Sequence, residues 1–516
     1  MRRGAFHWIF DVTHRSRIGI LSAVVITGLV LASGCSSGDA PESARSGESA
    51  EITGGPTRVV ATLKLADYGR DMQVISARGY DIAGVDLEAN EVDLVVEHAT
   101  MKALRNEGFD VVRSKEVPLE LEVPADRGLT SSYKAPGDVE ALIQNYAASF
   151  PEIAAAKSIG KSSQGRDIWV FRITKNAQAP HDASKPVILF NGAHHARELM
   201  SVEVPIDTID TLLNGYGTDP KITHWVDANE IWVMPMLNVD GSNQVFTHDT
   251  MWRKNAKGCP ASGTCASHTG VDINRNYPYG WASCNGSSSS TRADDYHGPS
   301  AASEPETNAM MKLVADIRPV FDISYHAYSE VVLYPYGCQG QHVPSQAVVS
   351  DFAQKMASKL PSDDSPSRNY RPGTPWELLY SADGGDMDWM FHEYQVMAYA
   401  IEINGTRQGF QPAFATWRQK TVTKLRGAWQ LMLDRVDGPG VRGVVHEMPA
   451  GTQVEVAAAP GTTAVTQSRP VNPDGSFHVV TLPGTYKVTV TAPGHAAFAQ
   501  TVTIAAARAN LDIRLP

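Results

Sequence analysis

Residues 187–200 read VILFNGAHHARELM, in which a short apolar run leads into two adjacent histidines and a glutamate. The apolar run predicts a buried strand, and the apolar spacing of residues 201–213 (SVEVPIDTIDTLL) predicts a helix directly after it. Side chains in such a connecting loop lie in the crevice at the carboxyl ends of the strands. The H-x-x-E spacing therefore indicates a candidate metal site, with His195 on the loop and Glu198 in the first helical turn.

The alternation of strand and helix continues along the chain on both sides of this stretch. Strand-like runs (IWVFRI, PVILF, EIWVMPML, FDISYHAY and MAYAIEI) alternate with helical runs such as EPETNAMMKLVADI, and a last helical run, TVTKLRGAWQLMLDRV, follows them. This order is typical of an α/β domain with a mixed, mostly parallel sheet flanked by helices. We expect that domain to span residues 130–436.

Two smaller units flank the α/β domain. Residues 57–125 show strand patterns in RVVATLKL, EVDLVVE and FDVV and a helical pattern in ATMKALRNEG, which predicts a small α+β unit. This unit is either a prosegment that covers a catalytic cleft or a docked accessory domain. Residues 439–516 alternate apolar and polar residues between turn signals, which predicts a β-sandwich that contributes stability or surface attachment rather than chemistry.

The first 56 residues predict export. Arginines precede an apolar run from Ile18 to Leu31, and the residues LASGC at 31–35 resemble a lipoprotein processing site, at which Cys35 would carry lipid. An uncleaved anchor is the alternative, but a membrane span needs about 20 apolar residues. We therefore expect residues 1–35 to be a signal peptide, residues 36–56 to be a flexible linker, and the protein to lie in the cell envelope or outside the cell.

Charge and cysteine content narrow the classes of partner. The formal net charge is −11 and no dense block of Lys and Arg is present, which excludes nucleic acid as the expected partner. We expect a monomer. Beyond Cys35, an even number of cysteines in an exported chain predicts two disulfides, with three pairings open, rather than a metal site. These cysteines are Cys259, Cys265, Cys284 and Cys338.

A third metal ligand is available far along the chain. His326 follows the apolar run of FDISYHAY, so it would emerge at the same edge of the sheet as His195 and Glu198. Three ligands leave one position open, as in catalytic zinc sites. Glu402 interrupts the apolar strand MAYAIEI, where burying a charge is costly unless function or a partner compensates it.

These motifs, together with the W-R-K-N and D-x-N-R-N segments, resemble the zinc metallocarboxypeptidases of the carboxypeptidase A type. The resemblance covers about residues 133–435 and is closest to secreted bacterial members such as carboxypeptidase T. It implies that one Zn²⁺ is held by His195, Glu198 and His326, and that His194 is not a ligand. It also implies that Asp272 hydrogen-bonds the first ligand histidine and fixes its orientation.

The same resemblance implies the catalytic and substrate-binding groups. Arg253 would polarise the carbonyl of the bond that is cut, and Glu402 would be the general base. Asn274 and Arg275 would bind the terminal carboxylate of the substrate, since a guanidinium matches two carboxylate oxygens. Tyr380 would close over bound substrate, unless it is a packed core tyrosine.

More distant substrate contacts are implied at three positions, for each of which simple packing or solvent exposure is an equal alternative: Arg197, Tyr328 and Phe410. In the specificity pocket, Met387 favours an apolar or aromatic C-terminal residue. Asp383 and Asp386 lie close to it in the sequence. If either carboxylate reaches the pocket, Lys or Arg would be accepted as well.

The resemblance implies an exported zinc-dependent carboxypeptidase that hydrolyses the C-terminal peptide bond of peptides or proteins, with Glu402 assisting the attack of zinc-bound water. A peptidase for cell-wall peptides, or a zinc amidohydrolase acting on acylated amino acids, would keep the metal ligands but need other groups in place of Asn274 and Arg275. A non-catalytic protein that binds peptide ends would be expected to lack Glu402 or Arg253.

Overall fold

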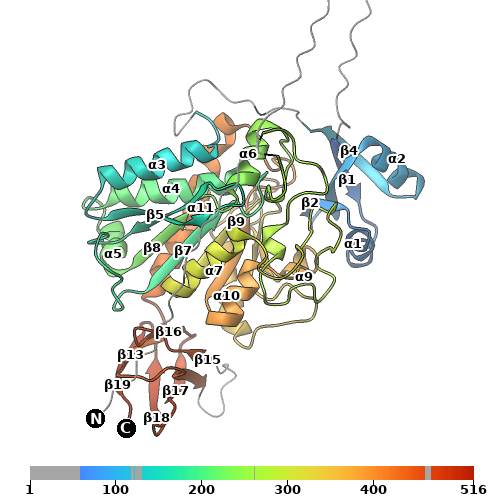
Figure 1. Ribbon diagram of the computed structural model, residues 1–516. Coiled ribbons are helices and arrows are strands. Elements are labelled where there is room, and N and C mark those ends of the chain that lie inside the picture. The colour runs from blue at the N-terminus through green and yellow to red at the C-terminus, as the bar shows by residue number, and fades with distance from the viewer. Residues whose placement is uncertain (1–57, 118–120, 122–130, 261, 459–466) are drawn as a thin grey trace, which may run out of the picture. The chain divides into compact units, whose positions relative to one another are not determined.

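The computed structural model describes most of the chain, namely residues 58–117, 121, 131–260, 262–458 and 467–516. The predicted signal peptide at 1–35 with Cys35, and the predicted linker at 36–56, lie outside the described residues. The segment Gly55–Pro516 forms one compact unit, and its sheets and helices are labelled in Figure 1. Among the described residues, no helix is both long enough and apolar enough to cross a lipid bilayer.

The first described residues form a small α+β unit. Its elements are β1 (Arg58–Lys64), α1 (Tyr68–Ala77), β2 (Asp81–Asp86), β3 (Glu91–Glu97), α2 (His98–Asn106) and β4 (Asp110–Glu116). The four strands form an antiparallel sheet in the order β2-β3-β1-β4, and apolar residues of both helices pack against it. The sequence reveals neither α1 nor β2, because YGRDMQVISA and DIAGVD lack a regular apolar spacing.

The central sheet is mixed and has parallel strands at its centre, as the sequence predicts. Among the described residues it has eight strands in the order β11-β10-β12-β9-β7-β8-β6-β5. Adjacent pairs among β12, β9, β7 and β8 are parallel, and their apolar runs are buried because helices cover both faces. The bounds are β5 (Ala154–Lys161), β6 (Asp167–Ile173), β7 (Val187–Gly192), β8 (Glu230–Met234), β9 (Phe321–His326), β10 (Val331–Leu333), β11 (Arg371–Gly373) and β12 (Met397–Glu402).

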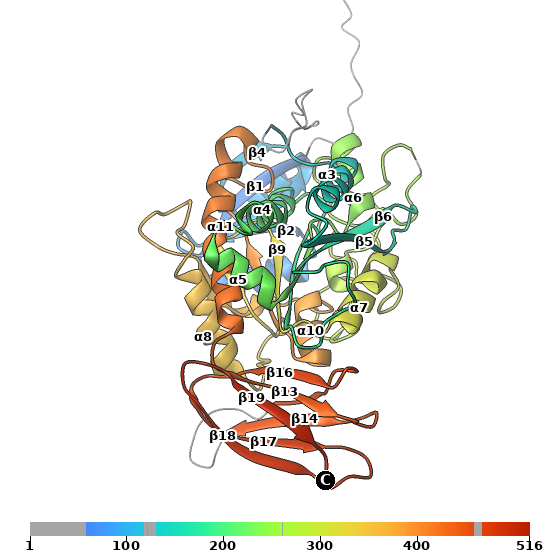
Figure 2. The ribbon, with the colours of Figure 1, turned by 90° about the vertical axis from the view of Figure 1, so that its left-hand side faces the viewer.

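Helices cover the two faces of this sheet. Their bounds are α3 (Pro136–Ser149), α4 (Met200–Gly215), α5 (Pro220–Ala228), α6 (Val239–Thr247), the 3-10 helix η1 (Ile273–Arg275), α7 (Pro305–Ile317), α8 (Gln346–Ala357), α9 (Pro375–Leu378), α10 (Asp386–Tyr394) and α11 (Phe414–Val436). Helix α4 packs across β7, β8 and β9, and α11 packs against α4. Helices α7 and α10 lie on the opposite face (Figures 1 and 2).

The loop between β7 and α4 corrects one expectation. Helix α4 begins at Met200, so Glu198 lies just before the helix and not in its first turn. The chain forms tight turns before the helix begins. Ser201 Oγ stabilises them, because it donates to Glu198 O (2.5 Å) and accepts from Ala193 N (3.0 Å). The loop passes so close to α4 that a Cβ at Gly192 would lie 2.1 Å from Ser201 O, which only glycine avoids.

The register of three neighbouring parallel strands positions the crevice. Glu402, the last residue of β12, lies opposite His326, the last residue of β9. Gly192, the last residue of β7, lies opposite Tyr325. Because parallel strands end at the same edge, the loop that carries His195 starts beside His326 and Glu402.

The C-terminal residues form two sheets that share an apolar core, which confirms the predicted β-sandwich. One sheet has the order β16-β13-β19 and the other β15-β14-β17-β18. The bounds are β13 (Gly440–His446), β14 (Gln453–Ala458), β15 (Gln467–Pro470), β16 (Ser476–Val480), β17 (Gly484–Thr491), β18 (Phe498–Ile504) and β19 (Ala509–Arg514). The boundaries expected between the three units stay a prediction, since all lie within one compact unit.

Candidate active site

Three predicted ligands converge at the carboxyl edge of the sheet. His195 Nδ1 lies 2.7 Å from Glu198 Oε1, and His326 Nδ1 lies 3.1 Å from Glu198 Oε2. The two Nδ1 atoms are 3.2 Å apart, and the ligand atoms of all three residues fall within 4.8 Å of one another. All three side chains are buried. A shared cation would make so close an approach of two imidazole nitrogens and a carboxylate favourable.

The donor set and its supports fit zinc. Two imidazole nitrogens and one carboxylate leave a fourth position open, which is the arrangement of catalytic zinc sites. Both histidines turn Nδ1 inward, and their outer nitrogens meet fixed polar groups: His195 Nε2 lies 3.3 Å from Asp272 Oδ1, and His326 Nε2 lies 3.2 Å from Ser324 Oγ. Such partners fix the ring orientation and tautomer of ligand histidines.

Glu198 is held as a charged ligand. Its Oε2 also accepts a hydrogen bond from the backbone N–H of Ala327 (3.1 Å). Burial alone would raise the pKa of the Glu198 carboxyl, but the neighbouring His195 and His326 outweigh burial and hold it below its usual range. The carboxylate is therefore ionised at neutral pH, as metal binding requires.

His194 lies outside the cluster of three candidate ligands. Its Nε2 lies 3.0 Å from the Tyr277 hydroxyl and its Nδ1 lies 3.4 Å from Ser324 Oγ. Burial lowers the pKa of His194 to about 4, so the ring is neutral. It belongs to a buried polar cluster behind the metal ligands.

Arg253 and Asp272 link the metal ligands to the crevice. Arg253 donates from Nε (3.0 Å) and Nη2 (2.8 Å) to Asp272 Oδ2, while Asp272 Oδ1 faces His195. Arg253 Nη1 lies 3.9 Å from Glu198 Oε1. Against the effect of burial, Arg253 and His195 hold the pKa of Asp272 well below its usual range. One carboxylate thus orients a ligand and an arginine at the same time.

One cavity brings together most of the predicted groups, but Arg197, Asp272 and Phe410 are not in its lining. Its volume is about 790 Å³, counting the part open to solvent. The predicted site residues in its lining are His195, Glu198, Arg253, Asn274, Arg275, His326, Tyr328, Tyr380, Met387 and Glu402. Burial raises the pKa of Glu402 to about 8, and a divalent cation nearby would oppose that shift.

Asn274 and Arg275 reach the cavity from η1. Asp272 caps this turn, because its Oδ1 accepts from Asn274 N (2.9 Å). Arg275 donates from Nε to Gly286 O (3.1 Å) and from Nη1 to Asn274 O (2.9 Å). Asn274 Oδ1 accepts from Asp386 N (2.9 Å). The guanidinium and amide are therefore held in place before any substrate binds, which lowers the entropy cost of binding.

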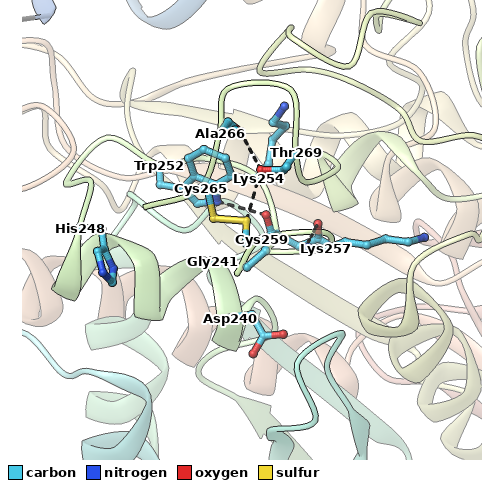
Figure 3. Close-up of a disulfide and its surroundings, with 12 residues drawn as sticks. Asp240, Gly241, His248, Trp252, Lys254, Lys257, Cys259, Cys265, Ala266 and Thr269 are labelled. Atoms are coloured by element: carbon cyan, nitrogen blue, oxygen red, sulfur yellow. Dashed lines mark hydrogen bonds between the residues drawn. A yellow bond between two sulfur atoms is a disulfide. The ribbon is translucent and has the colours of Figure 1, made fainter. Parts of the chain in front are cut away.

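Two disulfides brace the loops that carry these groups. Of the three pairings left open by the sequence, the structure has Cys259–Cys265 and Cys284–Cys338. The first closes a short loop after Arg253, and its Cys259 sulfur lies 3.3 Å from Thr269 Oγ1 (Figure 3). The second joins Cys284 to Cys338, which directly follows Gly337 of the cavity lining. A disulfide restricts the unfolded chain between its two cysteines.

Two carboxylates line the cavity beside Met387, at the place predicted for the specificity pocket. Asp386 and Asp388 line the cavity, whereas Asp383 accepts from Cys284 N, Gly286 N and Ser287 Oγ and does not line it. Asp388 Oδ2 accepts from Gly337 N (2.8 Å), and within the described residues its Oδ1 has no hydrogen-bond partner. Burial raises the pKa of Asp388 to about 7. The sequence reasoning missed Asp388, although this residue directly follows Met387 in the chain.

The three residues predicted to form more distant substrate contacts lie against the N-terminal unit. Arg197 Nη2 donates to Asp81 Oδ1 (2.6 Å), and its guanidinium lies 4.3 Å from the ring centroid of Phe410. The Tyr328 hydroxyl donates to Asp93 (2.9 Å). All three side chains are buried, and sequence reasoning did not anticipate either carboxylate.

Strand β2 of the same unit forms part of the cavity wall. Residues 82–85 line the cavity, and Val85 N donates to Ser329 Oγ (3.0 Å). A Cβ at Gly84 would lie 2.4 Å from the Tyr328 ring, so the strand approaches the subsite as closely as glycine allows. The N-terminal unit therefore lies directly against the predicted substrate path.

Fold and site together define an α/β metalloprotein with its metal centre at the carboxyl edge of a mixed sheet. Comparison with known proteins then gives the family. The sequence model of the zinc carboxypeptidase family matches residues 139–425, which is more than half of the chain. The chain belongs to the zinc carboxypeptidase family, whose metal suits the His-Glu-His cluster.

Individual relatives agree with this membership. Carboxypeptidase A1 from Bos taurus is 29% identical over 266 residues, which cover 51% of this chain and 60% of that protein. A zinc carboxypeptidase from Saccharothrix mutabilis subsp. capreolus is 28% identical over 366 residues, covering 66% of this chain and 80% of that one. Less than two thirds of the bovine protein is thus aligned.

The solved structure of carboxypeptidase A from Helicoverpa armigera has the same fold. It superposes with a TM-score of 0.60 and 22% sequence identity, and the match covers 73% of this chain and 96% of that one. The α/β architecture expected from the sequence is thereby confirmed.

We predict that Asp272→Asn weakens zinc binding about 10- to 100-fold. An amide has one acceptor oxygen, so it cannot serve both His195 and Arg253 as the carboxylate does. Competition with a chelator, followed on folded protein, measures the change. Asp316→Asn, at an exposed position on α7, is the matched control; equal losses in the two variants would contradict the assigned role.

Proposed function

We propose that this protein is a zinc-dependent carboxypeptidase that hydrolyses the C-terminal peptide bond of peptides or proteins. One observation carries the proposal: the metal ligands, the carboxylate of Glu402 and the pair Asn274 and Arg275 line the same cavity. Family membership supports the same conclusion.

Each group has a role that follows from its chemistry. When bound, zinc supplies Lewis-acid activation of water and of the scissile carbonyl. Glu402 accepts a proton from the attacking water and returns it to the leaving amine. Arg253, already oriented by Asp272, donates to the developing oxyanion. Burial of these groups strengthens each interaction because little water competes.

Removal of single residues from chain ends follows from Asn274 and Arg275. A guanidinium and an amide together match a terminal carboxylate, and an internal peptide bond offers no such group. A peptidase for cell-wall peptides or an amidohydrolase on acylated amino acids would need other groups at this place. A non-catalytic binding protein would have no need for Glu402 and Arg253 in the same cavity.

We predict that Glu402→Gln lowers kcat for C-terminal hydrolysis roughly 10²- to 10⁴-fold while zinc stays bound, because only the proton acceptor is lost. Turnover of peptides and metal content of the same sample are measured together. Glu393→Gln, exposed on α10, serves as the control. Retained turnover in Glu402→Gln with zinc present would exclude the role of general base.

For the released residue, we propose a mixed preference for apolar and basic side chains. Met387 supplies an apolar wall, while Asp386 and Asp388 present buried carboxylates to the same cavity. A Lys or Arg side chain would pair with the unbonded oxygens of these carboxylates and so remove the cost of burying them.

This preference predicts a specific pH dependence. Asp388 is neutral below its pKa of about 7 and charged above it, so kcat/KM for a peptide ending in Lys, divided by that for one ending in Leu, rises between pH 6 and pH 8. Asp388→Asn lowers this ratio about tenfold at pH 8 and flattens its pH profile. Asp383→Asn leaves the ratio unchanged. A ratio that is insensitive to Asp388→Asn would refute the proposal.

The N-terminal unit, expected at 57–125, is in our proposal a prosegment that restricts access to the cavity. Its support is the buried pair Asp81–Arg197, the bond from Tyr328 to Asp93, and β2 in the cavity wall. All of these contacts would have to break before a peptide could reach Arg197 and Tyr328.

We predict that Asp81→Ala raises peptidase activity of the intact chain at least about tenfold, because one partner of a buried charge pair is lost. Initial rates with a short peptide measure it. Glu107→Ala, at an exposed position of the same unit, is the control. If both variants keep wild-type rates, the accessory-domain alternative is correct.

Export stays part of the proposal. The two disulfides are consistent with an oxidising compartment, and the processing site at Cys35 provides for attachment to a membrane surface. The predicted location is therefore the cell envelope, or the exterior if the chain is released.

A further inference from the structure

A second cavity lies where the C-terminal sandwich meets the central domain. It measures about 350 Å³, counting the part open to solvent, and shares no lining residue with the catalytic cavity. We call it the junction cavity. Its polar lining comprises His181, Lys185, Arg318, Arg442, Arg469, Asn472, Ser476 and His478.

The charge of this lining is one-sided. Lys185 and Arg318 come from the central domain, and Arg442 and Arg469 come from the sandwich. Within the described residues, no aspartate or glutamate lines the junction cavity. Like charges brought together in this way repel one another unless something of opposite sign lies between them.

Three of the lining side chains have buried polar atoms left over, namely donors on Arg469 and His478 and the amide oxygen of Asn472. Arg469, on β15, is 3% exposed, and His478, on β16, is 6% exposed. Arg469 Nη1 donates to His478 O (2.6 Å). Arg469 Nε and His478 Nδ1 have no hydrogen-bond partner among the described residues. Leaving a buried polar group unsatisfied costs about 1–3 kcal/mol, so a missing partner is indicated.

Two further arginines lack a carboxylate. Arg442, on β13, lies opposite His478 in the sheet register. Arg318, at the end of α7, donates from Nε to Ala315 O (2.8 Å) and stacks on the Tyr394 ring at 3.9 Å. Within the described part of the chain, neither has a carboxylate oxygen within 4.0 Å, and the same holds for Arg469.

The nearest carboxylates are already committed. His181, at the rim, lies between Glu230 (3.1 Å) and Asp474 (3.4 Å), and these partners raise its pKa to about 9. Glu230 also pairs with Arg172 (2.5 Å). Lys185 Nζ donates to neutral oxygens, of which Thr174 Oγ1 is the nearer (2.9 Å).

The pKa shifts of Arg469 and His478 agree with an excess of positive charge that no acidic side chain of the described lining balances. Burial, together with the charge of Arg318, lowers the pKa of Arg469 to about 10. Burial and the surrounding arginines hold the pKa of His478 well below its usual range, so His478 is neutral and can donate one hydrogen bond. A water molecule could satisfy hydrogen bonds here, but it could not offset the charge.

We infer that the junction cavity binds a free inorganic oxyanion, phosphate or sulfate, held by Arg318, Arg442 and Arg469. Guanidinium groups match the oxygens of such ions with paired, charge-assisted hydrogen bonds. Arg442 and Arg469 come from β13 and β15, and Arg318 directly follows α7. A bound anion would therefore join the sandwich to the central domain as an ionic crosslink.

The consequence concerns stability and not chemistry at the zinc centre. An ion that binds only the folded, docked form stabilises that form in proportion to its occupancy. Phosphate or sulfate should raise the unfolding temperature beyond the effect of chloride at equal ionic strength. The rate of peptide hydrolysis at saturating substrate should not change.

Calorimetric titration of the full chain with sodium phosphate and with sodium sulfate, at constant ionic strength set by sodium chloride, tests this inference. We expect one saturable site. Arg442→Gln and Arg469→Met should each weaken phosphate binding about tenfold or more. Arg514→Gln, at an exposed position of β19, is the matched control and should bind as the wild type does.

Three results would overturn the inference. The first is the absence of saturable binding of both oxyanions by the wild type. The second is a thermal shift that chloride reproduces, which indicates screening alone. The third is an equal loss of affinity in Arg514→Gln. Should Arg469→Met fail to fold, Arg442→Gln decides the test, because Arg442 is only partly buried. Circular dichroism identifies a misfolded variant.

Discussion

The parallel register of β7, β9 and β12 is the constraint on which the rest of the site depends. It places Glu402 opposite His326 and starts the loop with His195 beside both. Side chains alternate between the faces of a strand, so a slip by one residue would exchange Glu402 for a buried isoleucine. The apolar sequences of these strands, covered by helices on both faces, prevent that slip, and core packing thereby fixes the catalytic geometry.

The site also depends on how buried charges are compensated. Asp272 serves a ligand histidine with one oxygen and Arg253 with the other, and Glu198 faces two imidazoles. Arg197 obtains its carboxylate from a different structural unit, at Asp81. The junction cavity lacks such compensation, since its arginines face one another without an acid in the described lining. The difference between the two places is the basis for assigning a bound anion to the junction.

Much of this arrangement follows from local patterns. Apolar runs mark the buried strands, 3.6-residue spacing marks the helices, and chemistry-bearing residues directly after such runs mark the crevice edge. Three features did not follow from such patterns. Elements α1 and β2 have weak apolar periodicity, and Glu198 lies in turns that precede the start of α4. Asp388 lines the cavity because of how the surrounding segments pack. Asp81 and Asp93 have no local signal, because their partners are more than 100 residues away.

By itself, the sequence determined the order of strands and helices and the candidate metal ligands, because these depend on periodicity and on position relative to strand ends. The candidate base and the candidate carboxylate-binding pair came from the family resemblance of the motifs. Only the tertiary structure decided which cysteines pair, which carboxylates line the cavity beside Met387, and which polar atoms in the described residues remain without a partner. The physical reason is that pairing and burial are relations between distant segments. A residue's neighbours in the chain do not reveal which solvent, counter-charge or hydrogen bond it will lose or gain on folding.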